Sequence, residues 1–209
     1  WQFARAVEGI TAACRALDIP ITGGNVSLYN ETDGKAIYPT PVLGVVGLIE
    51  DASRVLGRSF AGAGDAIVLL GQTRHELGGS EYLKVTQRVV AGVPPEVNLN
   101  AEKALQQLLV AGAREGLIRS AHDCAEGGLA VTLAECAFGT GGLGLTVDVP
   151  GVAAPDAWVS TSTLFAESAS RVAVSVSRDR LGALLDRAQA LSVPAREVGV
   201  TGSSRITIS

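Results

Sequence analysis

The order in which apolar segments and amphipathic stretches follow one another is the feature that most constrains the fold of this chain. Apolar residues recur at helical spacing over residues 3–17, which predicts a helix to about Asp18 and then a short strand at residues 19–22. Residues 42–49 form a nearly continuous aliphatic run, typical of a strand buried on both faces. Helices and strands mix without strict alternation along the whole chain, so the pattern predicts an α+β fold rather than a doubly wound sheet.

A cluster of glycines within residues 54–64 indicates a boundary, beyond which a fresh α/β unit begins. The periodicity of the second unit alternates between that of strands and that of helices. We expect strands at residues 66–70, 143–149 and 172–176, a closing hairpin of residues 197–201 and 205–208, and helices at residues 81–90, 101–116, 127–138 and 178–191.

Composition and charge exclude several function classes. A formal net charge of -4 argues against a nucleic-acid-binding surface, which needs clustered Lys and Arg. No apolar run approaches the ~18 residues that a bilayer-spanning helix needs. The 3 cysteines have no zinc-ligand or disulfide spacing and are typical of free thiols in a reducing cytosol. We therefore expect a cytoplasmic protein that binds neither nucleic acid nor membrane.

The start of the chain lacks both a methionine and a helix N-cap, because Trp1 already belongs to the expected apolar stripe. Methionine is absent from the whole sequence. We therefore expect this chain to be a piece of a longer polypeptide, with part of its active site elsewhere.

Residues 23–30, Gly-Gly-Asn-Val-Ser-Leu-Tyr-Asn, form the most informative loop of the chain. Two consecutive glycines let the backbone approach a phosphate closely, because no Cβ stands in the way. Asn25 and Ser27 add oxygen atoms suited to a hard cation such as magnesium and to a substrate hydroxyl or phosphate. The same spacing also occurs in ordinary strand-to-loop connections, so both interpretations stay open at this point.

A second cluster of polar residues precedes the Gly pair that opens the helix expected at residues 127–138. Asp123 and Glu126 could hold a metal or a phosphate there, or cap the helix, which is the commoner role of an acid at this position. Cys124 beside His122 does not predict thiol catalysis, because no third group is present to orient the histidine.

Three further positions carry weaker signals. Ser80 is a good N-cap for the helix that follows it, although the same geometry accepts a phosphate. Residues 164–171 combine an acid, two hydroxyls and Arg171, and they either line a site or form a turn with one surface ion pair. His75 lies alone in a polar loop and is expected to be a solvated residue.

Taken together and in this order, these stretches resemble a known family. The matching motifs are residues 19–31, 39–51, 77–82, 121–130 and 165–171. Over nearly its whole length the chain resembles the C-terminal part of phosphoribosylformylglycinamidine synthases, and it is similar to the small bacterial synthetase subunit of purine biosynthesis. It covers only the last part of such a subunit.

The resemblance implies an internally duplicated fold related to aminoimidazole ribonucleotide synthetase. Residues 1–60 would be the rear half of an N-type domain, and residues 62–209 a C-type α/β domain with a mixed sheet. The implied activity is that of an ATP-dependent ligase, with ATP and Mg²⁺ as cofactors. Such enzymes phosphorylate the amide oxygen of formylglycinamide ribonucleotide, and ammonia then displaces the phosphate to give the formylglycinamidine. The implied partners are a glutaminase subunit, which supplies the ammonia, and a small accessory subunit.

The resemblance also implies roles for particular residues. Gly24 would contact ATP, Asn25 would coordinate magnesium through its side-chain oxygen, and Ser27 would contact the ribonucleotide. Asp123 would help hold magnesium at an auxiliary nucleotide site. Neither histidine of this chain falls in the family's catalytic motif, so no catalytic residue is assigned and the chain alone is expected to be inactive.

Two features depart from the family's pattern, and two alternative functions remain. Ala166 and Ala169 replace a glycine and a proline, which puts ligand roles for Glu167 and Ser168 in doubt. One alternative is a related synthetase or kinase, such as aminoimidazole ribonucleotide synthetase, selenophosphate synthetase or thiamine-phosphate kinase, in which the run at residues 25–30 is not expected. The other is a non-catalytic nucleotide-binding scaffold that positions partner subunits.

Overall fold

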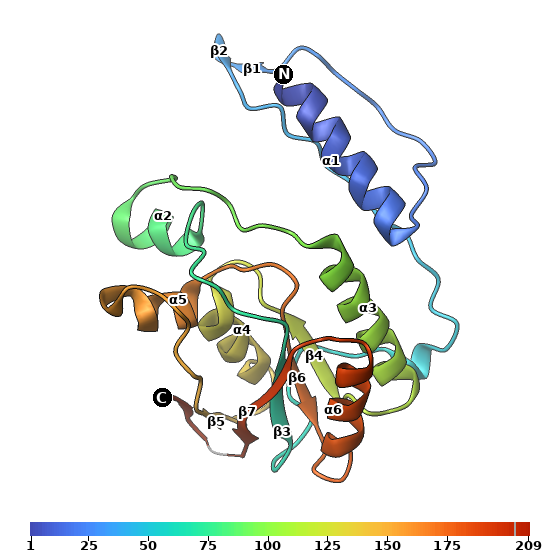
Figure 1. Ribbon diagram of the computed structural model, residues 1–209, viewed down its shortest axis with the longest axis vertical. Coiled ribbons are helices and arrows are strands. Elements are labelled where there is room, and N and C mark those ends of the chain that lie inside the picture. The colour runs from blue at the N-terminus through green and yellow to red at the C-terminus, as the bar shows by residue number, and fades with distance from the viewer. Residues whose placement is uncertain (203) are drawn as a thin grey trace. The chain divides into compact units, whose positions relative to one another are not determined.

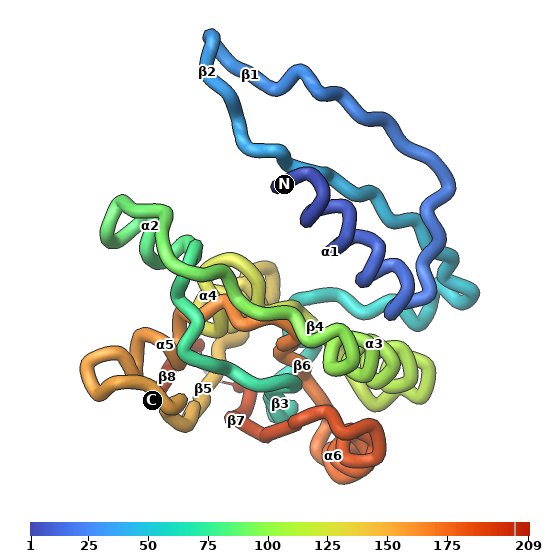
Figure 2. The backbone as a smooth tube through the Cα atoms, turned by 45° about the horizontal axis from the view of Figure 1, so that its top comes forward, coloured from blue at the N-terminus to red at the C-terminus, as the bar shows by residue number. Residues whose placement is uncertain are grey.

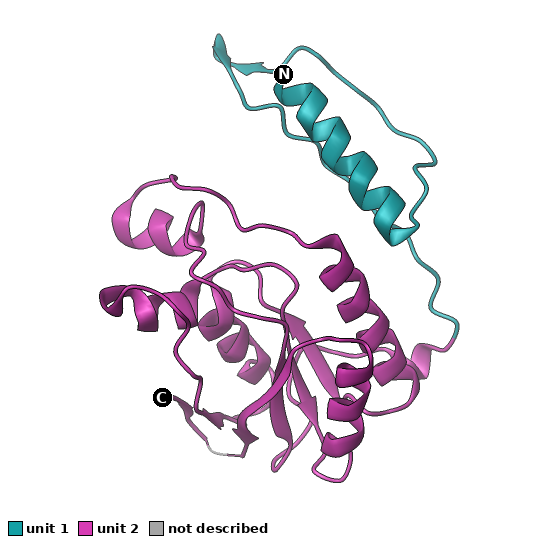
Figure 3. Ribbon diagram, viewed as in Figure 1, with its two compact units in different colours: residues 1–50 teal, residues 51–209 magenta. Residues whose placement is uncertain are grey.

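The computed structural model describes residues 1–202 and 204–209. These residues form two compact units, residues 1–50 and residues 51–209 (Figure 3). Each unit has its own secondary structure and its own pattern of burial.

Unit 1 consists of one helix, one short hairpin and extended connections. The helix α1 spans Gln2–Leu17, and the strands β1 (Glu31–Thr32) and β2 (Lys35–Ala36) pair antiparallel. The turn between the strands places Asp33 and Gly34 at positive φ, as a tight two-residue hairpin turn requires. The helix α1 confirms the helix that the apolar periodicity of residues 3–17 predicts.

The two strands expected in unit 1 are wrong. Residues 19–22 and 42–49 have no strand assignment, and their apolar side chains are exposed, up to 98% for Val46. A strand is stabilised by a hydrogen-bonded neighbour and by an apolar layer that covers it. The only strands in the described residues of unit 1 are those of the short hairpin, and none of residues 1–50 is buried. The aliphatic pattern is present here without the partners that would turn it into a buried strand.

Unit 2 holds most of the regular structure, and the segments expected as helices and strands there mostly form. In chain order its elements are η1 (Ala52–Arg54), β3 (Ala66–Leu70), α2 (Glu81–Gln87), α3 (Leu99–Arg114), β4 (Ser120–Asp123), α4 (Gly128–Ala137), β5 (Leu145–Val147), η2 (Asp156–Trp158), α5 (Val159–Phe165), β6 (Val172–Val176), α6 (Leu181–Ala190), β7 (Ala195–Thr201) and β8 (Ile206–Ile208). The strand β4 and the helix α5 were not expected from the sequence pattern.

The strands of unit 2 form one mixed sheet in the order β4-β6-β3-β7-β5-β8. All neighbours are antiparallel except β5 and β8, which run parallel, so the α+β class with a mixed sheet is confirmed. The expected closing hairpin is wrong, because β5 lies between β7 and β8. Leu145 faces Thr201 on one side and Ile206 on the other. Local spacing cannot reveal a strand that enters from more than fifty residues earlier in the chain.

Helices cover both faces of this sheet (Figures 1 and 2). Successive residues of β3 point to opposite faces, as the two-residue period of a strand dictates. Ile67 and Leu69 belong to a hydrophobic cluster with residues of α4, whereas Val68 and Leu70 belong to a second cluster with residues of α3 and α6. The core is almost entirely aliphatic, and its burial on both faces makes the sheet a rigid support.

Three loops lie at one edge of the sheet, which we call the loop edge of unit 2. The strand β6 runs antiparallel to both β3 and β4. The loops that follow β3 and β4 therefore lie at the same edge as the loop that precedes β6. These are residues 71–80, residues 124–127 and residues 166–171, and several of the polar residues singled out above lie on them.

Candidate functional site

The glycine loop of unit 1 is an irregular, exposed segment. Residues 23–30 carry no helix or strand, and all of them are exposed. A Cβ built on Gly23 or Gly24 would meet no atom within 4 Å, so the backbone at this point is open to an approaching group. Inside the loop, the side-chain amide of Asn30 donates to the carbonyl oxygen of Ser27, at 3.2 Å.

The three residues of this loop that the resemblance singles out lie within four positions of one another. The side chains of Asn25 and Ser27 are accessible to a ligand, as is the backbone at Gly24. Their roles towards magnesium, the ribonucleotide and ATP remain predictions.

The loop edge of unit 2 is organised by a buried arginine. Arg171 is only 2% exposed, and its Nε donates to the carbonyl oxygen of Ser168 at 2.9 Å. Its Nη1 donates to Oγ1 of Thr73 at 2.9 Å, and its Nη2 to the carbonyl oxygen of Ala166 at 2.5 Å. Burial lowers the pKa of this guanidinium, while Cys124 and two neighbouring carboxylates act in the opposite direction. Of the two alternatives for residues 164–171, the turn with a surface ion pair is wrong, because Arg171 is buried and its hydrogen bonds go to uncharged oxygens.

Glu167 joins two helix N-termini. Its Oε1 accepts a hydrogen bond from the backbone N–H of Glu81, the first residue of α2, at 2.9 Å. The same oxygen accepts from the backbone N–H of Gly127, the N-cap of α4, at 2.8 Å. The alternative in which Asp123 or Glu126 caps α4 is therefore wrong, since Gly127 receives no local side-chain cap. The acid that satisfies this N-terminus comes from 40 residues away along the chain.

The sequence pattern places Glu167 in a polar cluster but does not predict that its carboxylate joins two helix N-termini. The available signal was a glycine pair at a helix start with no Ser, Thr, Asp or Asn directly before it. By contrast, the prediction that Ser80 caps α2 is confirmed, because its Oγ accepts from the backbone N–H of Leu83 at 3.4 Å.

Asp123 lies at the end of β4 with its side chain 72% exposed. Its Oδ1 is 3.2 Å from Nδ1 of His122, and Nε2 of that histidine is 2.7 Å from Oε2 of Glu135. Within residues 1–202 and 204–209, no group of three or more His, Cys, Asp or Glu is arranged to hold a metal ion. Asp123 therefore offers one accessible carboxylate, and its role as a magnesium ligand remains a prediction.

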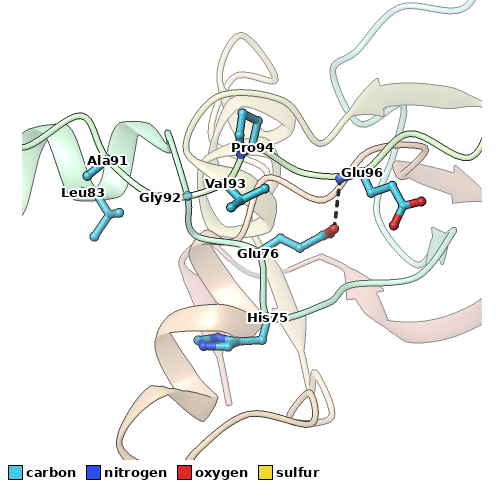
Figure 4. A pocket seen from close by; sticks show the side chains of 9 residues that line it. His75, Glu76, Leu83, Ala91, Gly92, Val93, Pro94 and Glu96 are labelled. Atoms are coloured by element: carbon cyan, nitrogen blue, oxygen red, sulfur yellow. Dashed lines mark hydrogen bonds between the residues drawn. The ribbon is translucent and has the colours of Figure 1, made fainter.

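A cavity of about 510 Å³ adjoins the same loops (Figure 4). The residues that line it include Glu76 and Glu96 and the apolar residues Leu83 and Val93. Oε1 of Glu76 accepts from the backbone N–H of Glu96 at 3.1 Å. The backbone oxygen of Glu76 accepts from the N–H of Glu167, at 3.3 Å, which links the cavity wall to the loop before β6.

The cysteines are free thiols and His75 is exposed, as the sequence predicts. Cys124 and Cys136 are buried free thiols, and burial raises the pKa of Cys136 to about 12, with that of Cys124 raised as well. A thiol kept protonated in this way is a poor nucleophile. His75 is exposed, although its Nδ1 lies 2.6 Å from Oγ of Ser162.

None of the helices in the described residues has both the length and the apolar character that crossing a bilayer requires.

Comparison with known proteins places both units in one family. Residues 62–208 match the family described as "AIR synthase related protein, C-terminal domain". Residues 1–49 match "AIR synthase related protein, N-terminal domain". The C-terminal match alone covers most of the chain.

Individual relatives agree with this assignment. The phosphoribosylformylglycinamidine synthase subunit PurL of Moorella thermoacetica is 46% identical over 208 residues, which are 100% of this chain and 28% of that protein. Among solved structures, Thermotoga maritima PurL complexed with FGAR superposes with a TM-score of 0.63 at 22% identity, covering 76% of this chain and 27% of the other. T. maritima PurL complexed with ATP gives a TM-score of 0.57 at 20% identity, covering 76% and 25%.

The chain thus spans 28% of the length of the Moorella relative. The structural neighbours share its fold at low sequence identity. From the two domain matches and the mixed sheet with helices on both faces, we conclude that this chain belongs to the family of AIR synthase related proteins.

Proposed function

We propose that this chain is the C-terminal part of an ATP-dependent ligase that makes formylglycinamidine ribonucleotide from formylglycinamide ribonucleotide, ATP and glutamine-derived ammonia. The observation that carries the proposal is the 46% identity to a PurL subunit over 208 residues, which are the whole of this chain. The boundaries proposed for the two parts are residues 1–60 for the partial N-type domain and residues 62–209 for the C-type domain.

The chemistry explains why such an enzyme needs ATP. An amide oxygen is a poor leaving group, whereas phosphate is a good one, so phosphorylating the oxygen allows ammonia to displace it. Magnesium, when bound, neutralises the negative charge that builds up on the phosphoryl oxygens. The protein's task is to hold the nucleotide and the ribonucleotide next to each other and to exclude water.

The glycine loop supplies groups suited to this task. The open backbone at Gly24 would lie against ATP, and the Ser27 hydroxyl would hydrogen-bond to the ribonucleotide. The Asn25 side-chain oxygen would hold Mg²⁺. Magnesium keeps several waters and takes few protein oxygens when phosphates supply the rest, so a single exposed amide oxygen fits it. Asp123 would hold a second magnesium at an auxiliary nucleotide site of structural importance.

The proposal extends to partners and place in the cell. A glutaminase subunit would deliver the ammonia, and a small accessory subunit would complete the synthase. We place the enzyme in the cytoplasm, where free thiols such as the buried Cys124 and Cys136 stay reduced. The catalytic histidine would lie in a part of the enzyme outside these residues, so the chain alone would be inactive.

The experiment that tests the proposal measures ammonia-dependent synthesis in the intact polypeptide and in its Asn25→Ala and Ser27→Ala variants. We expect Asn25→Ala to lower kcat at least about a hundredfold, because it removes a ligand from the charge-neutralising cation. Ser27→Ala should chiefly raise KM for the ribonucleotide. Asn100→Ala, which removes an exposed amide on α3, is the matched control and should leave both constants unchanged. Full activity of Asn25→Ala would overturn the proposal for this loop.

A further inference from the structure

At the loop edge of unit 2, a carboxylate of the protein itself lies where the sequence allowed for a bound phosphate. A glycine pair stands just before α2, and another, Gly127 and Gly128, opens α4; the sequence allowed phosphate contact at both helix starts. In the structure, the Glu81 and Gly127 N–H groups at these starts point at one oxygen, Oε1 of Glu167. The positive ends of two helices are therefore engaged by the protein's own carboxylate.

The loop that carries Glu167 is itself held on several sides. Its carbonyl groups at residues 166 and 168 accept hydrogen bonds from the buried guanidinium of Arg171. The Ser168 hydroxyl accepts from the backbone N–H of Arg74 at 3.0 Å. The backbone N–H of Glu167 donates to Glu76, at 3.3 Å. The carboxylate is thus presented from a fixed support, rather than from a free turn.

Close backbone contact at the glycine pair strengthens this arrangement. Gly128 has a φ of +67°, and a Cβ built on it would lie 2.6 Å from the carbonyl oxygen of Ala166. The turn between β4 and α4 therefore packs directly on the loop before β6, and only glycine fits at this position. Asp123 and the N-cap Gly127 flank the connection that this contact holds in place.

We propose that Glu167 is a positioning residue whose carboxylate latches the turn between β4 and α4 to the first turn of α2. The latch fixes the turn that directly follows Asp123, the last residue of β4, and it leaves the engaged N–H groups unavailable to phosphate. The latch itself goes beyond the proposed function, and only its consequence for the magnesium role of Asp123 rests on that function.

Hydrogen exchange in the full chain tests the latch directly. In Glu167→Ala, amide exchange should become about tenfold faster or more in both residues 77–87 and residues 124–130, because both N–H groups lose a charged acceptor. Glu167→Gln keeps an acceptor oxygen and should show a smaller change at both sites. Glu197→Ala, which removes an exposed carboxylate paired with Arg178, should leave both segments unchanged. Faster exchange in only one of the two segments would overturn the proposal.

Anion rescue distinguishes the contribution of the carboxylate as a hydrogen-bond acceptor from that of side-chain packing. In Glu167→Ala, sodium formate should restore protection in both segments, because formate can occupy the space of the missing carboxylate and accept from the same N–H groups. Sodium chloride at equal ionic strength is the control. Equal effects of the two salts, or none from formate, would show that side-chain packing holds the loops and would contradict the latch.

A magnesium titration separates the latch from the metal role of Asp123. The measured quantity is the shift in melting temperature that Mg²⁺ alone produces in the intact polypeptide. If Asp123 is a ligand, Asp123→Asn should abolish the part of this shift due to its site, and Glu167→Ala should weaken the same part. A full shift in Asp123→Asn would refute the metal role and leave the latch to be decided by hydrogen exchange. A full shift in Glu167→Ala, with loss in Asp123→Asn, would show that the latch does not position Asp123.

Discussion

A single buried cation, Arg171, has a large influence on the loop edge of unit 2. Taking a guanidinium out of water costs free energy unless its N–H groups find acceptors. Here two backbone carbonyls and the Thr73 hydroxyl accept from it. The benefit is mutual, because the same carbonyls would otherwise lack a donor in the interior. The arginine therefore acts as a cross-link between the loop after β3 and the loop before β6.

We expect Arg171→Leu to lower the free energy of unfolding by about 3–5 kcal/mol, since it leaves several buried acceptors unsatisfied. Arg178→Leu is the matched control. Arg178 is half-exposed and pairs with Glu197 at the surface, so its loss should cost no more than about 1 kcal/mol. Urea unfolding followed by circular dichroism measures both changes. Similar losses in the two variants would contradict the special role of Arg171.

At the scale of elements, close strand packing limits which residues β7 accepts. A Cβ built on Gly199 would lie 2.1 Å from the backbone oxygen of Thr146 on β5. Gly199 also pairs with Ile67 of β3, next to a register shift in the β3–β7 ladder. The close approach on the β5 side depends on the missing side chain, which is a common reason for glycine inside a strand.

Two glycine substitutions compare the crowded position Gly199 on β7 with the open position Gly182 on α6. Gly199→Ala should destabilise unit 2 by about 1–3 kcal/mol, because the methyl group forces β5 and β7 apart. Gly182→Ala on α6 should instead stabilise it by about 0.5 kcal/mol, since no atom lies within 4 Å of the new methyl and alanine favours the helix. Melting temperatures of the two variants give the comparison. A stable Gly199→Ala variant would show that the strands can separate without cost.

At the scale of the whole molecule, buried apolar surface is unevenly distributed. Both hydrophobic clusters lie within residues 51–209, whereas no residue of unit 1 is buried. Burial of apolar surface is the main favourable contribution to folding, so unit 2 has its own source of stability and the described part of unit 1 does not.

We therefore expect residues 51–209, expressed alone, to unfold in one cooperative thermal transition close to that of the whole chain. Residues 1–50 alone should show no cooperative transition, because a single amphipathic helix of this length is marginal in water. Circular dichroism melting of the two pieces and of the whole chain makes the comparison. Loss of the transition in residues 51–209 would mean that unit 1 stabilises unit 2.

The sequence by itself determined the features whose causes lie within a few residues of one another. The helix over residues 3–17, the strands β3 and β6, and the Ser80 cap follow from periodicity and from capping chemistry, which are local. The α+β class follows in the same way from the order of these segments. The glycine loop was recognisable too, because its distinctive residues are consecutive.

Only the tertiary structure decided the features whose partners are distant in the chain. The pairing of β8 with β5 and the two hydrogen bonds to Glu167 join residues about 40 or more positions apart. The burial of Arg171 depends on contacts of the same kind. Likewise, the aliphatic run at residues 42–49 did not become a buried strand. A hydrophobic pattern states what a segment can bury, but the neighbours that complete the burial and the hydrogen bonds are set by the folded chain.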